Sequence, residues 1–356
     1  MKAMLSISAR SKDDRTWFNE RKDWHLGEHL LNTLPILEAT LEAGVAADSP
    51  TKLSDTTTAL WRRAGWHRSY GTGRGRDETE EFRVLLQAGA NVNFADHETR
   101  KTVMMRAAVR RHEFIPLLLD AGARVNLRDS KGKSTLAYAA RYPSAKPSTL
   151  QRLLDASAVE TLAQSKDAGP YASSASDPGT GGIVDWADQD GNTPLMAAIS
   201  AQNLEAALFL AEGANIHATN NDGHGALLSA VDRGMDEVMA MLLSRGVDIE
   251  HRDVRGRTPL MVAIEQWDHH QVKRLLRAGA NADALYEASS VTKVPLIMAA
   301  AAGKELVVRD LIDHGADMQL VKKLKPDLAR QCKIAGNDDL AQWLVKHGMN
   351  DREESA

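Results

Sequence analysis

A short string near the N-terminus has the residue types and spacing of a zinc peptidase. His25, Glu28 and His29 form an H-x-x-E-H pattern, in which two histidines on one helical face bind the metal and the glutamate acts as base. Gly27 weakens a helix at this point, and the segment is too small to supply a third ligand. We therefore expect these side chains to pack in the fold, with no bound metal, and keep a metallopeptidase as an alternative.

A second segment combines basic and aromatic residues, as single-stranded nucleic acid binding does for phosphates and base stacking. No acidic residue occurs between Trp61 and Arg76. The segment contains Arg62, Arg63, Trp66, His67, Arg68, Tyr70 and Arg74. Acidic residues follow at Asp77, Glu78, Glu80 and Glu81 and can neutralise this charge. Three interpretations stay open: a solvated loop, a docking point for an acidic protein, and a nucleic-acid-associated regulator that uses residues 61–76.

The rest of the chain shows no pattern of a catalytic or cofactor site. His269 and His270 are expected in a solvated turn, and the single cysteine, Cys332, in a buried helix. The net charge of −4 gives no reason to expect nucleic acid as partner. The longest uncharged apolar run, 294–302, is far shorter than the ~20 residues of a membrane span. We expect a monomeric cytoplasmic protein that is not an enzyme and needs no cofactor.

The elements that must position any site repeat along the chain. Leucine-rich stretches end at a glycine or other small residue, at intervals of 33–36 residues apart from two longer ones of 45 and 56. These positions are Gly89, Gly122, Ser157, Gly213, Gly246, Gly279 and Gly315, with weaker copies at Gly44 and Gly348. Such an ending predicts a helix that stops in the left-handed conformation. Gly132, Gly191, Gly223 and Gly256 predict hairpin turns.

A second repeating signal, which predicts the start of another helix in each unit, occurs in the same register. Thr193-Pro194-Leu195 and Thr258-Pro259-Leu260 place a capping threonine before a proline in the first turn. Looser copies begin at Thr102, Ser134, Gly225 and Val294.

Residues 28–349 therefore resemble the ankyrin-repeat family, whose period is 33 residues. The resemblance implies an all-α repeat solenoid of helix-turn-helix units with β-hairpin fingers, about nine units including caps. The family's histidine after Thr-Pro-Leu is replaced, for example by Met105, Met196 and Met261. We expect apolar packing, in place of the polar network of that histidine, to join neighbouring units.

Interval arithmetic divides the chain into five segments. We expect an N-terminal segment or cap at 1–27, repeats 1–4 at 28–164 with an insertion at 65–77, a Gly/Pro/Ser-rich loop at 165–182, repeats 5–9 at 183–349 and a tail at 350–356. The hairpin pattern resumes in register at Val184, which favours one continuous stack over two half-arrays.

The resemblance implies a protein that binds a partner protein through its concave groove and hairpin tips. An inhibitor or immunity protein that neutralises a cognate toxin or effector is the finer hypothesis, with a general adaptor or regulator scaffold as the alternative. The candidate partner-binding residues are Trp66, Arg68, Arg106, Arg110, Tyr138, Arg141, Tyr142, Trp186, Asp188, Asn221, Asp222, Arg233, Asp253, Glu265 and Trp267. Tyr138 and Trp186 have a second interpretation, packing between repeats. Trp17, Trp24 and Trp343 are expected in the cores of the two caps.

Overall fold

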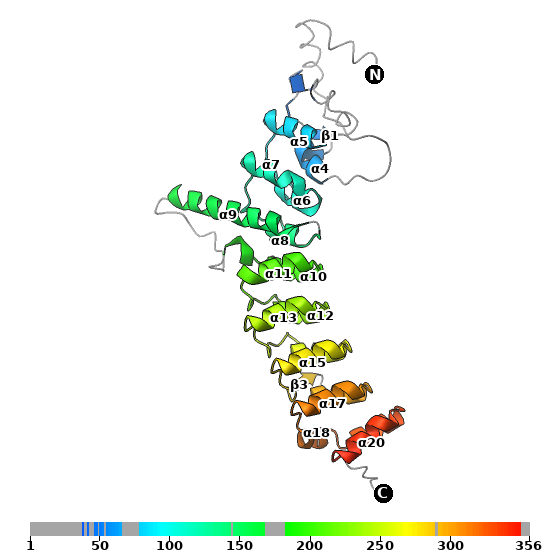
Figure 1. Ribbon diagram of the computed structural model, residues 1–356. Coiled ribbons are helices and arrows are strands. Elements are labelled where there is room, and N and C mark those ends of the chain that lie inside the picture. The colour runs from blue at the N-terminus through cyan, green and yellow to red at the C-terminus, as the bar shows by residue number, and fades with distance from the viewer. Residues whose placement is uncertain are drawn as a thin grey trace. The chain divides into compact units, whose positions relative to one another are not determined.

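The computed structural model describes residues 38, 41–42, 46–48, 50–52, 55–65, 78–143, 145–167, 182–288 and 291–349. The chain divides into two compact units, residues 1–189 and 190–356, and each is described by itself. Within the described residues, helices follow one another in eight antiparallel pairs, so the all-helical repeat architecture is confirmed (Figure 1).

The described residues of the first unit form three helix pairs. Its elements are β1 (Pro50–Lys52), β2 (Asp55–Thr58), α4 (Ala59–Gly65), α5 (Glu78–Gln87), α6 (Val103–Arg110), η3 (His112–Phe114), α7 (Ile115–Asp120), α8 (Thr135–Ala140), α9 (Pro147–Asp167) and η4 (Ile183–Asp185). The first helices of these pairs, α4, α6 and α8, pack against one another in that order.

Five helix pairs lie in the described part of the second unit. Its elements are α10 (Pro194–Ser200), α11 (Leu204–Gly213), α12 (Ala226–Asp232), α13 (Asp236–Ser244), α14 (Pro259–Glu265), α15 (His269–Arg277), β3 (Tyr286–Ala288), β4 (Val291–Lys293), α16 (Pro295–Ala301), α17 (Glu305–Asp313), α18 (Met318–Leu324), α19 (Leu328–Ile334) and α20 (Asp338–Lys346). Of the helices in the described part of the chain, none is long and apolar enough to cross a membrane.

Threonine caps start the first helices as expected. The hydroxyl oxygens of Thr102, Thr193 and Thr258 accept hydrogen bonds from backbone N–H groups three residues on, at 3.2, 3.4 and 3.4 Å. Each bond satisfies one of the N–H groups that a helix start leaves without a partner. Pro194 and Pro259 occupy the first helical turn, where proline costs no hydrogen bond.

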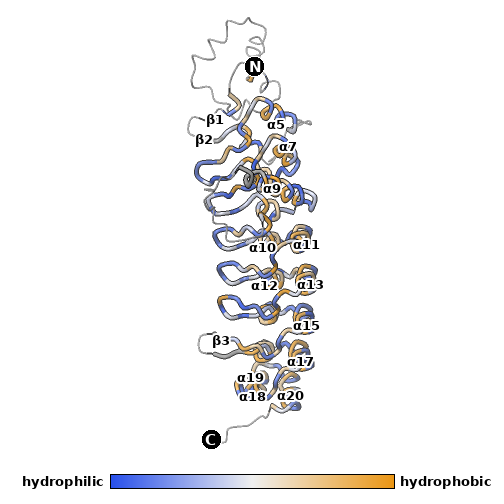
Figure 2. Tube along the Cα trace, turned by 90° about the vertical axis from the view of Figure 1, so that its left-hand side faces the viewer, coloured by the Kyte–Doolittle hydropathy of each residue, from blue (hydrophilic) through white to orange (hydrophobic). Residues whose placement is uncertain are grey.

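Leucines at the repeat spacing form the core of the second unit. In Figure 2 the polar hairpin loops lie on one side, the first helices in the middle and the second helices on the other side. At most 2 % of the surface is exposed for Leu195, Leu227, Leu260 and Leu296 of the first helices and Leu210, Leu242, Leu275 and Leu311 of the second. Burial of each leucine contributes about 1.5–3 kcal/mol, so every repeat adds a similar increment to one continuous core.

Two expected helix ends differ from the structure. Gly89, Gly122 and Gly246 have positive φ as predicted, but Gly213 does not, because α11 continues until the N–H of Ala214 binds the carbonyl of Leu210. Helix α9 passes Ser157, where an end was predicted, and runs on to Asp167. It therefore extends into the expected loop 165–182, of which residues 168–181 lie outside the described part.

Hydrogen bonds, and not apolar packing alone, join neighbouring repeats. In the first unit the N–H of Ser130 binds the carbonyl of Thr99 at 2.8 Å. In the second unit the N–H of Val254 binds the carbonyl of Asp222 at 3.1 Å. Both bonds link the turn of one hairpin to the next hairpin. The expectation of purely apolar junctions is wrong, because the extended backbone of the hairpins supplies its own polar ladder.

Candidate partner-binding surface

One position on the first helices distinguishes the two units. Four residues after the helix cap, the first unit has Arg106 in α6 and Tyr138 in α8, both partly exposed. The same position in the second unit holds Ala197 in α10, Ser229 in α12, Val262 in α14 and Met298 in α16. The fold therefore accepts a small or an apolar side chain at this point and does not require arginine or tyrosine, which leaves the exposed parts of Arg106 and Tyr138 for recognition.

Arg106 lies on an aromatic platform from the neighbouring repeat. Its guanidinium carbon is 3.6 Å from the ring centroid of Trp61 in α4. The indole N–H of Trp61 donates to the carbonyl of Lys101 at 2.9 Å, which fixes the ring. Burial lowers the pKa of Arg106, and the charges of Arg62 and Arg110 lower it further, against the opposing effect of Asp96. Positive charge is thus crowded around this guanidinium.

Tyr138 combines a structural hydrogen bond with partial exposure. Its hydroxyl donates to Asp129 Oδ2 at 2.7 Å, and the ammonium of Lys101 lies 5.4 Å from its ring centroid. Burial first, and then this hydrogen bond, raise the pKa of the Tyr138 hydroxyl. The interpretation of Tyr138 as a contact between repeats is therefore consistent with the structure, while Arg141 at the end of α8 is exposed and Tyr142 is half-buried.

Arginine and tryptophan also meet on the hairpins of the first unit. Arg128 lies 4.5 Å from the ring centroid of Trp186 and donates to the carbonyl of Ala187 at 2.9 Å. The carboxylate of Asp188 is mostly covered and lies 3.8 Å from the ammonium of Lys133. Trp186 and Asp188 therefore hold adjacent hairpins together and offer only part of their surface to a partner.

Asp253 is the clearest correction among the candidate residues. Its Oδ1 accepts from the N–H groups of Arg255 and Arg257 at 2.9 and 2.8 Å, and only 1 % of the side chain is exposed. Burial alone would raise its pKa, but the hydrogen bonds and charge of Arg257 hold the pKa below the ordinary value. Asp253 therefore closes its own hairpin and is not kept as a partner contact, because the fold already uses the carboxylate. Asn221 and Asp222 at the preceding tip are exposed.

Trp267 occupies an unusual backbone conformation in the turn between α14 and α15. Its φ is +62°, and the same position of other repeats in this unit holds Gln202, Gly234 and Gly303 with φ of +56°, +66° and +68°. A bulky residue in this conformation is strained. The residue is 49 % exposed, and the ammonium of Lys304 lies 5.0 Å from the centroid of its ring.

The other second-unit candidates are exposed charged groups. Arg233 is exposed, and its Nε lies 3.6 Å from Asp232 Oδ2. Glu265 accepts from Arg257 at 2.8 Å and is also exposed. Both remain candidates for a partner, although each already has an ion-pair contact within the chain.

The cap and loop expectations have mixed outcomes. Cys332 is buried as expected, and burial raises the pKa of its thiol. Trp343 is only partly buried, because it stacks on His347 at 3.8 Å at the surface of α20, so its assignment to the core is wrong. His269 and His270 begin α15 and bind Asp310 and Asp236 at 2.5 and 2.9 Å, and so do not form a free solvated turn.

Several sequence candidates lie outside the described residues. These are Trp17, Trp24, His25, Glu28, His29, Trp66, Arg68 and the rest of the insertion. The described start of the basic segment is helix α4, where Arg63 forms a buried ion pair with Glu81 of α5. The expected neutralisation of basic charge by the acidic residues that follow the segment therefore occurs at Arg63.

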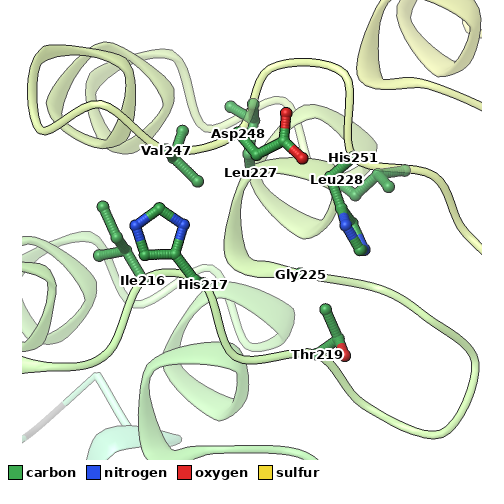
Figure 3. A pocket seen from close by; sticks show the side chains of 9 residues that line it. All are labelled: Ile216, His217, Thr219, Gly225, Leu227, Leu228, Val247, Asp248 and His251. Atoms are coloured by element: carbon green, nitrogen blue, oxygen red, sulfur yellow. The ribbon is translucent and has the colours of Figure 1, made fainter.

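A small pocket of the second unit lies between two successive hairpin loops and helix α12. About 110 Å³ is enclosed by Ile216, His217, Thr219, Gly225, Leu227, Leu228, Val247, Asp248 and His251 (Figure 3). Small-molecule sites are usually larger, roughly 300 Å³ or more. One ring nitrogen of His251 lies 2.8 Å from the carbonyl of Gly223, which gives this histidine a structural contact. Within the described ranges, no group of three or more metal-ligating side chains is placed to hold an ion.

Sequence reasoning missed the cationic contacts on aromatic rings between consecutive repeats. Arg106 on Trp61, Arg128 on Trp186 and Lys304 on Trp267 each join two repeats. Such contacts contribute about 0.5–1 kcal/mol at exposed sites. The available signal was a basic residue placed one repeat away from each aromatic residue.

Known proteins share this repeat. The family model of ankyrin repeats (3 copies) matches residues 158–253 and 227–322. The B-cell lymphoma 3 protein homolog of Mus musculus is 38 % identical over 108 residues, which are 30 % of this chain and 23 % of that protein. A putative ankyrin repeat-containing protein of Treponema pallidum is 31 % identical over 118 residues, 33 % of this chain and 39 % of that protein. The chain thus spans less than half of either relative.

Two solved ankyrin domains also align with the chain. The ankyrin repeat domain of Bcl-3 has a TM-score of 0.48 and 22 % identity, covering 66 % of this chain and 92 % of that one. The human ASB11 ankyrin repeat domain has a TM-score of 0.47 and 25 % identity, covering 62 % and 86 %. The family model shows that residues 158–322 consist of ankyrin repeats, and the capped helix pairs on either side of this range continue the same architecture.

Proposed function

We propose that this chain is a non-enzymatic module that binds a partner protein through its first helices and hairpin tips. The observation that supports the proposal is the difference at the fourth residue after the helix cap. Arg106 and Tyr138 stand where Ala197 and Ser229 are sufficient for folding elsewhere in the chain. Arginine and aromatic side chains contribute most at protein interfaces.

Further candidates extend this surface in each unit. Arg110, Arg141 and Tyr142 lie at the ends of α6 and α8. Arg233, Glu265 and Trp267 lie at the ends of α12 and α14, and Asn221 and Asp222 at a hairpin tip. A strained, exposed tryptophan is costly for folding alone, which supports a role for Trp267 in recognition.

The test is capture of a partner from native extract by the full chain, followed by titration with the purified partner. We expect a saturable one-to-one complex that Trp267→Ala and Arg141→Glu weaken without loss of helical content. Arg277→Glu, at an exposed position of α15 away from the candidate residues, is the matched control and should bind normally. Absence of any saturable partner, or equal binding by all variants, would contradict the proposal.

The same titration separates the two finer hypotheses. An inhibitor or immunity protein reduces the activity of its toxin or effector in proportion to complex formed, and reaches full inhibition at one equivalent. An adaptor or regulator scaffold leaves the activity of the bound protein unchanged.

A further inference from the structure

Three arginines of α6 and of the end of α8, Arg106, Arg110 and Arg141, form no ion pair in the described part of the chain. Asp96 is the acidic residue that acts on Arg106 from nearby. The Nε–H of Arg106 is buried and has no hydrogen-bond partner in the same part of the chain. A buried donor without a partner costs free energy, so the fold alone does not satisfy this guanidinium.

The geometry of Arg106 prepares it for a carboxylate. Its guanidinium lies at 3.6 Å on the Trp61 ring, and that ring is held by its own hydrogen bond to Lys101. A guanidinium that stacks on a ring keeps its in-plane N–H groups available, and these match the two oxygens of a carboxylate. Stacking also limits the side-chain motion that binding would otherwise have to restrict.

We propose that Arg106, Arg110 and Arg141 form a docking face for an acidic segment of the partner protein. The inference rests on the proposed function and names the chemistry of the partner. Arg110 lies one helical turn after Arg106, so the two are on the same side of α6. Arg141 ends α8, which packs directly on α6. An extended or helical segment with spaced Asp and Glu residues fits this row of positive charge.

The aromatic residues favour a protein over a nucleic acid. One face of the Trp61 ring is covered by Arg106, and the Tyr138 ring lies beneath Lys101. The Tyr138 hydroxyl is also occupied by Asp129. Base stacking requires accessible ring faces, and these rings already serve as supports for cations of the chain itself.

The experiment uses the full chain and two labelled probes, a polyglutamate peptide and a single-stranded oligonucleotide of equal charge. We expect the peptide to bind at low salt and to weaken as salt increases, because the contacts lie near the surface. Arg110→Glu with Arg141→Glu should weaken peptide binding by at least about tenfold, since two attractions become repulsions. Both positions are at helix ends, and circular dichroism of the variant should match the wild type.

A second variant tests the stacked guanidinium itself. Arg106→Lys keeps the charge but removes the planar pair of donors, and we expect weaker peptide binding at unchanged salt dependence. The control is Arg277→Glu with Arg330→Glu, which changes the net charge equally at exposed positions of the second unit and should leave peptide binding intact.

Three results with the two probes would overturn the inference. They are no peptide binding at low salt, equal weakening by the control pair, and preferential binding of the oligonucleotide through the same arginines. A natural partner that binds the Arg110→Glu, Arg141→Glu variant normally would also overturn it while leaving the proposed function intact. Failure of the proposed function itself would appear separately, as the absence of any saturable protein partner.

Discussion

Gly223 provides the most detailed stability prediction. It has φ of +70°, and a Cβ added there would lie 2.9 Å from the backbone nitrogen of Val254 and 3.1 Å from Asp253 Cα. Gly246 has φ of +75°, but a Cβ there would meet nothing within 4 Å. Alanine at either position is strained by the left-handed backbone conformation. Only Gly223→Ala also introduces a steric clash with the backbone of the next repeat.

The two costs can be separated by magnitude. The left-handed conformation costs an alanine about 1–2 kcal/mol. Forcing a methyl against a fixed backbone costs typically another ~1–3 kcal/mol. We expect Gly246→Ala to lower the free energy of unfolding by about 1–2 kcal/mol and Gly223→Ala by about 2–5 kcal/mol. The additional loss should be local, because the strained contact lies beside the Val254 N–H to Asp222 carbonyl bond.

Urea unfolding followed by circular dichroism measures the two free energies, and amide hydrogen exchange reports on the Val254 N–H. Gly223→Ala should unfold at lower urea than Gly246→Ala and should accelerate exchange at Val254. Equal losses in the two variants, with unchanged exchange at Val254, would refute the close packing of hairpins as a source of stability.

Three further predictions concern single side chains. Trp267→Gly should be more stable than Trp267→Ala by about 1–2 kcal/mol in urea unfolding, because both variants lose the ring but only glycine adopts a positive φ without strain. Equal free energies of unfolding would exclude backbone strain at position 267. The lowered pKa of Asp253 stabilises the fold above the unfolded pKa of about 3.9, and this stabilisation is lost as the pH falls through the folded pKa. The urea midpoint of Asp253→Asn should therefore change less between neutral and acid pH than the midpoint of the wild type. Parallel pH profiles of the two midpoints would contradict this. Cys332 should resist alkylation in native buffer and react on unfolding, because it is buried with a raised pKa; fast native labelling would show that the helix opens.

Helix starts and the leucine core were predictable because local signals determine them. Thr193 and Thr258 cap helices by contacts three residues away, and Leu195 and Leu260 are buried by the same register. These effects act over a single turn of chain, so the repeat pattern contains the information needed to locate them.

Features that depend on neighbouring repeats were not predictable in the same way. Helix α9 continues past Ser157 because no glycine or proline interrupts it before Gly169, and Glu160 on the extension accepts from the N–H groups of Val125 and Asn126 at 2.8 and 3.0 Å. Asp253 resembles an exposed tip residue in sequence, yet the hairpin folds around its carboxylate. The first outcome arises from a side chain that reaches the backbone of an earlier repeat. The second arises from a carboxylate that bonds N–H groups two and four residues on in its own hairpin.

Hydroxyl-radical footprinting of the chain, alone and with its partner protein, tests the central claim most directly. Tyr138, Tyr142 and Trp267 are partly or fully exposed on or next to first helices and react readily with the radical, whereas Phe209 on the second helix α11 is a partly exposed reference. We predict that the partner protects the first three residues and leaves Phe209 unchanged. Protection confined to Phe209 and the second helices, with no change at Tyr138, Tyr142 or Trp267, would contradict recognition through the first helices.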